Sequence, residues 1–197
     1  MAYPTVDKPY GFQPINRIGG NPYAGSTRLV PIASTSGLTN AAMFTGDLLE
    51  LTATGVCQVA ASGSAVPQAL GVCVGVQFVN SSGQTVQAQF APASSSTAFA
   101  YVVDDPTVLF KVVSVSGTTV VAGMGRTAVG QNTSVVLNAG VSATGDSQQA
   151  ISTTTNTTSS LPIRIVDVVP ETATAADTFV EFIVKINTHT YNSTTGI

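Results

Sequence analysis

Charged residues are scarce in this sequence. Of its 197 residues, 7 are lysine or arginine and 10 are aspartate or glutamate, so the charged fraction is 9% and the formal net charge is −3. An ordinary globular domain carries about 25% charged residues. Seven cations spread along the chain do not form the basic footprint of a nucleic-acid-binding protein, and that class is excluded. The hydrophobic fraction of 44% is ordinary and argues against intrinsic disorder, which requires low hydrophobicity and high net charge.

Long apolar runs are also missing. None approaches the 18 or more residues of a membrane-spanning helix, and no basic start followed by an apolar stretch marks a secretory signal. We therefore expect no membrane partner and assembly in the cytoplasm.

Residue types that carry catalysis or bind metals are few. His189 is the one histidine, so a Ser-His-Asp or Cys-His mechanism would depend on it. Cys57 and Cys73, with one remote histidine, do not supply the three or four ligands of a zinc site, and we expect two buried thiols rather than a disulfide. The adjacent Asp104 and Asp105 precede a proline and indicate a solvated turn, with a cation site or acid–base role as the alternative. The sequence predicts a protein that is not an enzyme and holds no cofactor and no metal.

What the sequence does contain is hydroxyl groups and short β patterns. Ser and Thr supply roughly a quarter of the chain, and such a surface, with little charge repulsion, is compatible with packing against other protein. Residues 70–78 alternate between bulky apolar side chains and small ones, so a second backbone can approach the small face closely. Residues 179–186 alternate as well, with Glu181 and Lys185 expected to be exposed. Roughly ten short strands separated by Gly, Ser and Asn turns predict an all-β sandwich or barrel with little helix.

The first 27 residues differ from the rest, because prolines recur at short intervals with aromatic residues among them. Proline fixes φ and removes a hydrogen-bond donor, so this stretch is predicted to be neither a helix nor a central strand. The predicted organisation is an extended N-terminal arm (1–27), a β-sandwich or barrel domain (28–186) and a C-terminal tail (187–197). A division of the domain into two lobes near residue 116 stays open.

The arm either packs on its own domain or reaches a neighbouring subunit. Each buried aromatic contributes about 1.5–3 kcal/mol by area, and aromatic residues and arginine are enriched at interface hot spots. The arm is therefore predicted to make an inter-subunit or capsid contact, with aromatic anchors and arginines at the rim. The predicted anchors are Tyr10, Phe12 and Tyr23, and the predicted rim charges are Arg17 and Arg28.

Several segments, taken in order, carry a resemblance to a known family. They are 7–14 (DKPYGFQP), 19–20 (GG), 25–28 (GSTR), 31–34 (PIAS), 46–47 (GD), 69–72 (ALGV), 101–106 (YVVDDP) and 186–189 (INTH). Together they resemble a family of small virion structural proteins of tailed phages, known mainly from marine and cyanobacterial phages. Residues 46–78 are also similar to the β-tulip head decoration proteins of lambdoid phages, which form trimers that clamp capsid subunits. The first 27 residues and the second half of this chain have no counterpart in those decoration proteins.

The resemblance implies a β-tulip-like fold and a capsid cement or decoration protein, located on the outer surface of the virion head. Its partners would be the major capsid protein and other copies of itself, most often in a trimer. Two alternatives remain. One is another virion component, such as a head fibre, vertex or tail protein. The other is a β-rich surface adhesin, against which the absence of tryptophan for sugar stacking counts.

Overall fold

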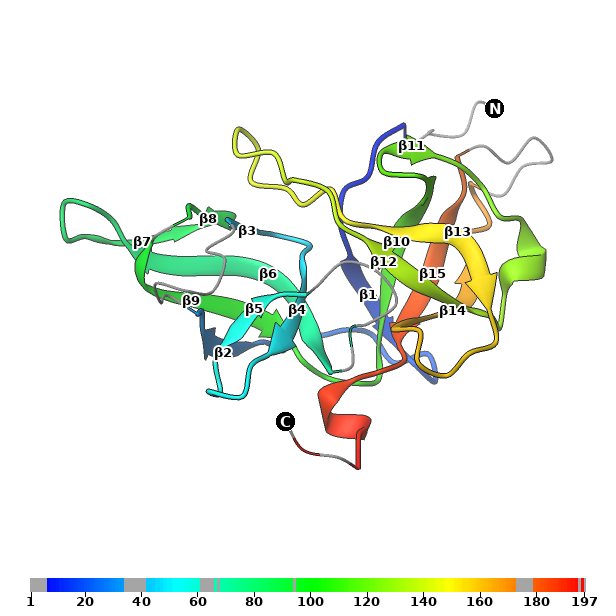
Figure 1. The fold of residues 1–197 in the computed structure, drawn as a ribbon, viewed down its shortest axis with the longest axis horizontal. Coiled ribbons are helices and arrows are strands. Elements are labelled where there is room, and N and C mark those ends of the chain that lie inside the picture. The colour runs from blue at the N-terminus through cyan, green and yellow to red at the C-terminus, as the bar shows by residue number, and fades with distance from the viewer. Residues whose placement is uncertain are drawn as a thin grey trace.

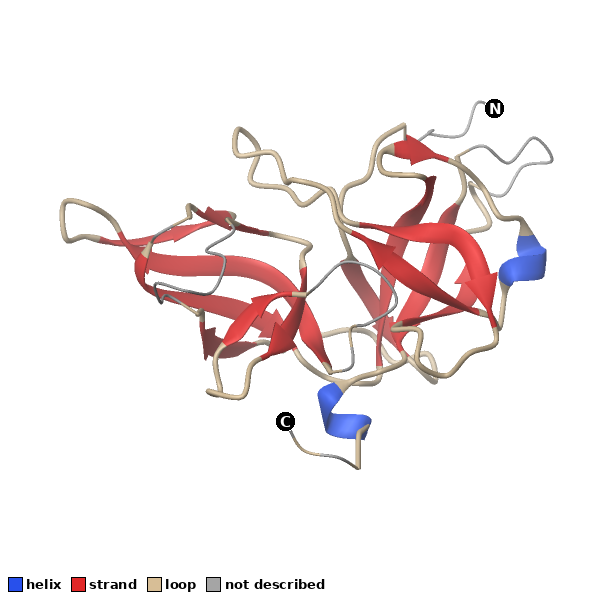
Figure 2. Ribbon diagram, viewed as in Figure 1, coloured by secondary structure: helices blue, strands red, loops and turns tan. Residues whose placement is uncertain are grey.

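The computed structural model describes residues 7–33, 42–60, 66, 68–93, 95–172, 179–194 and 196. Within these ranges the chain consists of strands, turns and two short 3₁₀ helices, which confirms the prediction of an all-β fold with little helix (Figure 2). The strands are β1 (Gln13–Arg17), β2 (Arg28–Pro31), β3 (Met43–Phe44), β4 (Leu48–Leu51), β5 (Cys57–Val59), β6 (Ala69–Val79), β7 (Thr85–Ala88), β8 (Phe90–Ala91), β9 (Ser96–Val103), β10 (Val108–Ser116), β11 (Val120–Val121), β12 (Asn132–Val136), β13 (Ala150–Asn156), β14 (Ile163–Val168) and β15 (Glu181–Ile186). The 3₁₀ helices are η1 (Arg126–Ala128) and η2 (Thr190–Asn192).

The larger lobe is a closed barrel. Strands β10, β13, β12, β14 and β15 pair in that order, and β15 pairs again with β10, so the sheet closes on itself. The β10–β13 pairing is parallel and the other four are antiparallel. Alternate residues of each strand point inward and fill the interior, as Phe182, Val184 and Ile186 of β15 do. Closure leaves these five strands with few free edges.

The smaller lobe is a curled sheet of strands β2, β9, β6, β4 and β5, with β7 beside β6. A bridge between Ile32 and Cys57 brings the end of β2 to β5, so this sheet also approaches closure. Its interior is a second apolar cluster that includes Leu49, Leu70 and Val76. The two lobes lie side by side in Figure 1.

The alternation over 70–78 predicted that the bulky side chains of the long strand β6 all point to the same side. In the structure they do not. The pairing of β6 with β9 shifts register between Cys73 and Gly75 and again between Gln77 and Val79. As a result Val72 packs into the barrel cluster, whereas Leu70 and Val76 pack into the smaller lobe. The predicted close approach to the small face is confirmed at Gly71, where a Cβ would lie 2.1 Å from the carbonyl oxygen of Val103.

The chain starts in the barrel, crosses to the smaller lobe and returns. Strand β1 pairs with β10 in the barrel, the described residues between 28 and 103 build the smaller lobe, and the chain re-enters the barrel through 104–107. The lobes therefore do not meet near residue 116, which is the last residue of the barrel strand β10. The smaller lobe is an insertion between β1 and the other barrel strands (Figure 1).

Both ends of the described chain pack on the body, which corrects two predictions. Residues 13–17, assigned to the extended arm, form β1, and Pro14 is accommodated because β1 is an edge strand with a register shift between Pro14 and Asn16. Residues 187–194, assigned to a tail, dock on the smaller lobe. There the Thr188 hydroxyl donates to Val66 O at 2.6 Å, and His189 forms a bridge with Ala69.

Candidate interaction surface at the lobe junction

Among the described residues the two lobes contact each other at several places, and one of them is a close backbone contact. Phe12 N donates to Gly46 O at 2.9 Å, and Ser147 N donates to Thr45 O at 2.8 Å. Gly11, which precedes Phe12, has a φ of +79°, and a Cβ at this position would stand 2.7 Å from Gly46 O. Only glycine accommodates both the left-handed backbone and this separation.

A buried carboxylate reinforces this backbone contact. Asp47, in the smaller lobe, accepts a hydrogen bond from the Ser147 hydroxyl of the barrel at 2.6 Å. It accepts another from the backbone N–H of Phe44, in its own lobe, at 2.8 Å. Burial raises the pKa of Asp47 to about 6, and the two hydrogen bonds act against that rise.

Two ion pairs hold the segment 104–107, where the chain crosses between the lobes. Arg17 Nη2 lies 3.0 Å from Asp105 Oδ2, and Arg28 Nε lies 2.7 Å from Asp104 Oδ2. Each carboxylate of the predicted solvated turn therefore faces its own arginine. Hydrogen bonds from the hydroxyl and backbone N–H of Thr107 lower the pKa of Asp105, and the nearby Arg17 charge adds to this effect.

His189 stabilises the C-terminal turn beside these ion pairs. Its side chain is 1% exposed, and its Nδ1 accepts the Tyr191 N–H at 3.1 Å, capping η2. Burial lowers the pKa of His189, while Asp104 and Asp105 oppose that shift. The neutral form is thus favoured, with its proton on Nε2.

Tyr191 extends from this turn to the surface. Its ring lies 5.4 Å from the His189 ring between centroids, and the Arg28 guanidinium stands over it at 5.3 Å. Arg28 also hydrogen-bonds the Tyr191 hydroxyl. Tyr191 is 47% exposed, so a large part of the ring faces solvent beside a cation.

Of the five predicted contact residues, Phe12 is buried, which corrects its prediction as an anchor for a partner, and Tyr10 is half-buried with its hydroxyl bonded inside the chain. Phe12 is 1% exposed in the barrel core, where it packs with the other apolar side chains. The Tyr10 hydroxyl donates to Glu181 at 2.5 Å, and Lys111 Nζ lies both over the Tyr10 ring and 3.2 Å from Glu181. This pairing also explains why Glu181, expected to be exposed, is buried.

The other three predicted residues do gather at the junction. The side chains of Arg17 and Arg28 are 37% and 51% exposed, and Tyr23 is half-buried against the barrel cluster, with its hydroxyl donating to Ser26 O. We define the junction surface as Arg17, Tyr23, Arg28, Asp104, Asp105 and Tyr191. Sequence reasoning missed Tyr191, because nothing in the sequence shows that the C-terminal segment folds back beside Arg28.

The junction surface offers aromatic faces and guanidinium groups but no reactive group in a catalytic arrangement. In the described part of the chain no three His, Cys, Asp or Glu side chains are grouped as a metal site would need. No helix in the described ranges is long and apolar enough to cross a membrane. Tyrosine and arginine, partly exposed and held in place by neighbours, suit binding to another protein surface.

No protein-family model, curated protein or solved structure matches this chain.

Proposed function

We propose that this chain is a non-enzymatic structural protein of a tailed-phage virion, and that it binds the outer surface of the head as a cement or decoration protein. The observation that carries the proposal is where the phage-like segments lie. They are dispersed along the sequence, and six of the eight come together in pairs where the lobes and the C-terminal segment are held together.

Three such pairs support this reading. Segment 7–14 bonds segment 46–47 through Phe12 N and Gly46 O at 2.9 Å. Segment 69–72 bonds segment 186–189 through Ala69 N and Thr188 O at 3.0 Å. Segment 25–28 meets segment 101–106 through Arg28 and Asp104. The resemblance thus concerns residues that contact one another in space and hold the body together.

A rigid body with a weakly charged surface suits a protein that acts by binding an assembled shell. Such a protein stabilises the shell by mass action, because it binds the assembled form and not the free subunits. The proposed partners are the major capsid protein and further copies of this chain in a trimer. The proposed contact is the junction surface.

The test compares phage heads that carry this protein with heads from a phage in which its gene is deleted. We expect the depleted heads to release DNA at lower temperature or lower ionic strength, and the purified protein to restore resistance. Unchanged head stability would contradict the proposal.

The contact itself is tested by binding variants to the depleted heads. Tyr191→Ala removes an exposed ring from the junction surface and should weaken binding at least tenfold, in the range of an interface hot spot. Tyr101→Ala is the matched control, because it removes the same side chain from a half-buried position away from the junction surface, where Tyr101 bonds Gln77 and Gln87 on the smaller lobe's sheet. Equal loss in both variants would place the contact elsewhere.

A further inference from the structure

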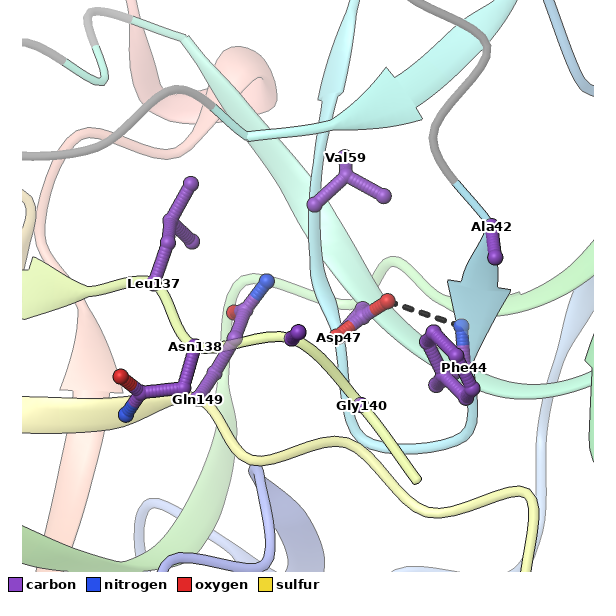
Figure 3. Close-up of a pocket in the computed structure, with 9 residues that line it drawn as sticks. Ala42, Phe44, Asp47, Val59, Leu137, Asn138, Gly140 and Gln149 are labelled. Carbon is purple, nitrogen blue, oxygen red and sulfur yellow. Dashed lines mark hydrogen bonds between the residues drawn. The ribbon is translucent and has the colours of Figure 1, made fainter. Parts of the chain in front are cut away.

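A pocket of about 390 Å³ lies between the two lobes, with Asp47 in its wall. The smaller lobe lines it with Phe44, Asp47 and Val59, and the barrel lines it with Leu137 and Gln149 among others (Figure 3). Its wall is mostly apolar, but two buried polar side chains, one from each lobe, face the same space.

Gln149 carries a hydrogen-bond donor without a partner. The side chain is 1% exposed, and its Oε1 accepts the Leu48 N–H at 2.9 Å. Because a backbone N–H donates to that atom, it must be the oxygen, and the orientation of the amide is fixed. Its Nε2 is buried and has no hydrogen-bond partner among the described residues. Figure 3 shows this nitrogen directed into the space that Leu137, Val59 and Asp47 surround.

An unpaired buried donor costs about 1–3 kcal/mol, so a hydrogen-bond acceptor in the pocket would stabilise the protein. Asp47, in contrast, can accept further hydrogen bonds, so a donor in the pocket would suit it. Each of its carboxylate oxygens accepts one hydrogen bond, from Ser147 or from Phe44 N, and a carboxylate can accept about four. The pocket therefore presents one donor and one acceptor to whatever occupies it.

We propose that this pocket binds a small molecule with a neutral amide group on an apolar body. The amide oxygen would accept from Gln149 Nε2, the amide N–H would donate to Asp47, and the body would lie against Phe44, Val59 and Leu137. An anion would meet the Asp47 carboxylate, and a hydrocarbon would leave Gln149 unpaired. This inference does not rest on the proposed role in the virion.

The probe is benzamide, which joins a primary amide to an apolar ring. We expect titration of the full-length, ¹⁵N-labelled protein at pH 7 to shift the side-chain NH₂ signals of Gln149 saturably, with a Kd in the millimolar range typical of fragments. Benzoate and toluene are the matched probes, and we expect each to bind at least tenfold more weakly. Equal affinity for all three would overturn the proposal.

Two variants assign the binding to the pocket. Gln149→Glu keeps an oxygen for Leu48 N but removes the donor, so it should weaken benzamide at least tenfold. Gln87→Glu makes the same change on an exposed side chain and should change nothing. Ala139→Trp places a large side chain at the exposed rim of the pocket and should block benzamide binding. Its control, Ala24→Trp, changes an alanine exposed elsewhere and should leave binding unchanged. This pair tests the proposal even if Gln149→Glu fails to fold. Benzamide affinity that is unchanged in Ala139→Trp would also overturn the proposal.

Discussion

Asp47 is a buried acid whose ionisation the fold opposes. Its pKa is raised from the usual 3.8 to about 6, chiefly by burial. A raised folded-state pKa contributes stability that is fully present below pH 3.8 and is lost as the pH rises through 6. His189 acts in the opposite direction, because its lowered pKa contributes stability above its usual value of 6.5 that is lost as the pH falls.

Comparison of Asp47→Asn with the wild type isolates the first effect. Asparagine can still accept from Phe44 N and donate to the Ser147 hydroxyl. We expect the variant to be more stable than the wild type at pH 7, by up to about 3 kcal/mol, with the advantage shrinking toward pH 4. Urea unfolding at several pH values measures this difference. A difference that is the same at pH 4 and pH 7 would show that the carboxylate is not destabilised by burial.

Substitution of Gly11 and of Gly25 distinguishes the cost of backbone strain from the cost of lost close packing. Their φ angles are +79° and +77°, but a Cβ on Gly25 would meet nothing within 4 Å among the described residues. Gly25→Ala should therefore cost only the left-handed penalty of about 1–2 kcal/mol. Gly11→Ala should cost a further 1–3 kcal/mol or so, because the added methyl overlaps Gly46 O and Ser147. Thermal unfolding of both variants checks this, and equal losses would mean that the lobes are not tightly apposed at Gly11.

Single residues were partly predictable from the sequence. The two cysteines are free and buried, as expected, and burial raises the pKa of Cys57 to about 12. The partners of Arg17, Arg28 and Glu181 were not predictable. Each pair joins residues at least seventy positions apart, and no local pattern encodes such contacts.

Strand β1 attaches the N-terminal segment to the barrel, and Phe12, just before it, supplies the anchoring side chain. We expect Phe12→Ala to destabilise the protein by about 3–5 kcal/mol, as for other buried phenylalanines. Phe179→Ala is the control, because Phe179 is 37% exposed and should cost far less. Chemical denaturation measures both. A small loss at Phe12 would restore the interpretation of this segment as an arm that serves a partner.

Strands with clear alternation and turn residues, such as 179–186, were located correctly from the sequence. Strand β1 was missed because Pro14 excludes only a central strand, and the sequence does not show that residues 13–17 pair as an edge strand with β10. The two faces of β6 were assigned wrongly for a related reason. Bulges change which side chains point inward, and their positions depend on the pairing with β9.

The arrangement of the lobes was beyond sequence reasoning. The chain passes between them at 104–107 through a short turn that resembles any other turn in the sequence. Closure of the barrel depends on the β10–β15 pairing, which joins residues about seventy positions apart. The sequence therefore predicted the class of fold, but not that the smaller lobe is inserted between the first barrel strand and the rest.

The proposal of a head-bound structural protein is tested most directly by imaging the virus particle to which the proposal assigns this chain. Counting copies of this chain against copies of the major capsid protein, and locating them in the density, distinguishes cement from a fibre, vertex or tail component. The account predicts a copy number close to that of the capsid protein, with the two-lobed body on the outer surface of the head. A few copies at one vertex or in the tail, or none in the particle, would contradict it.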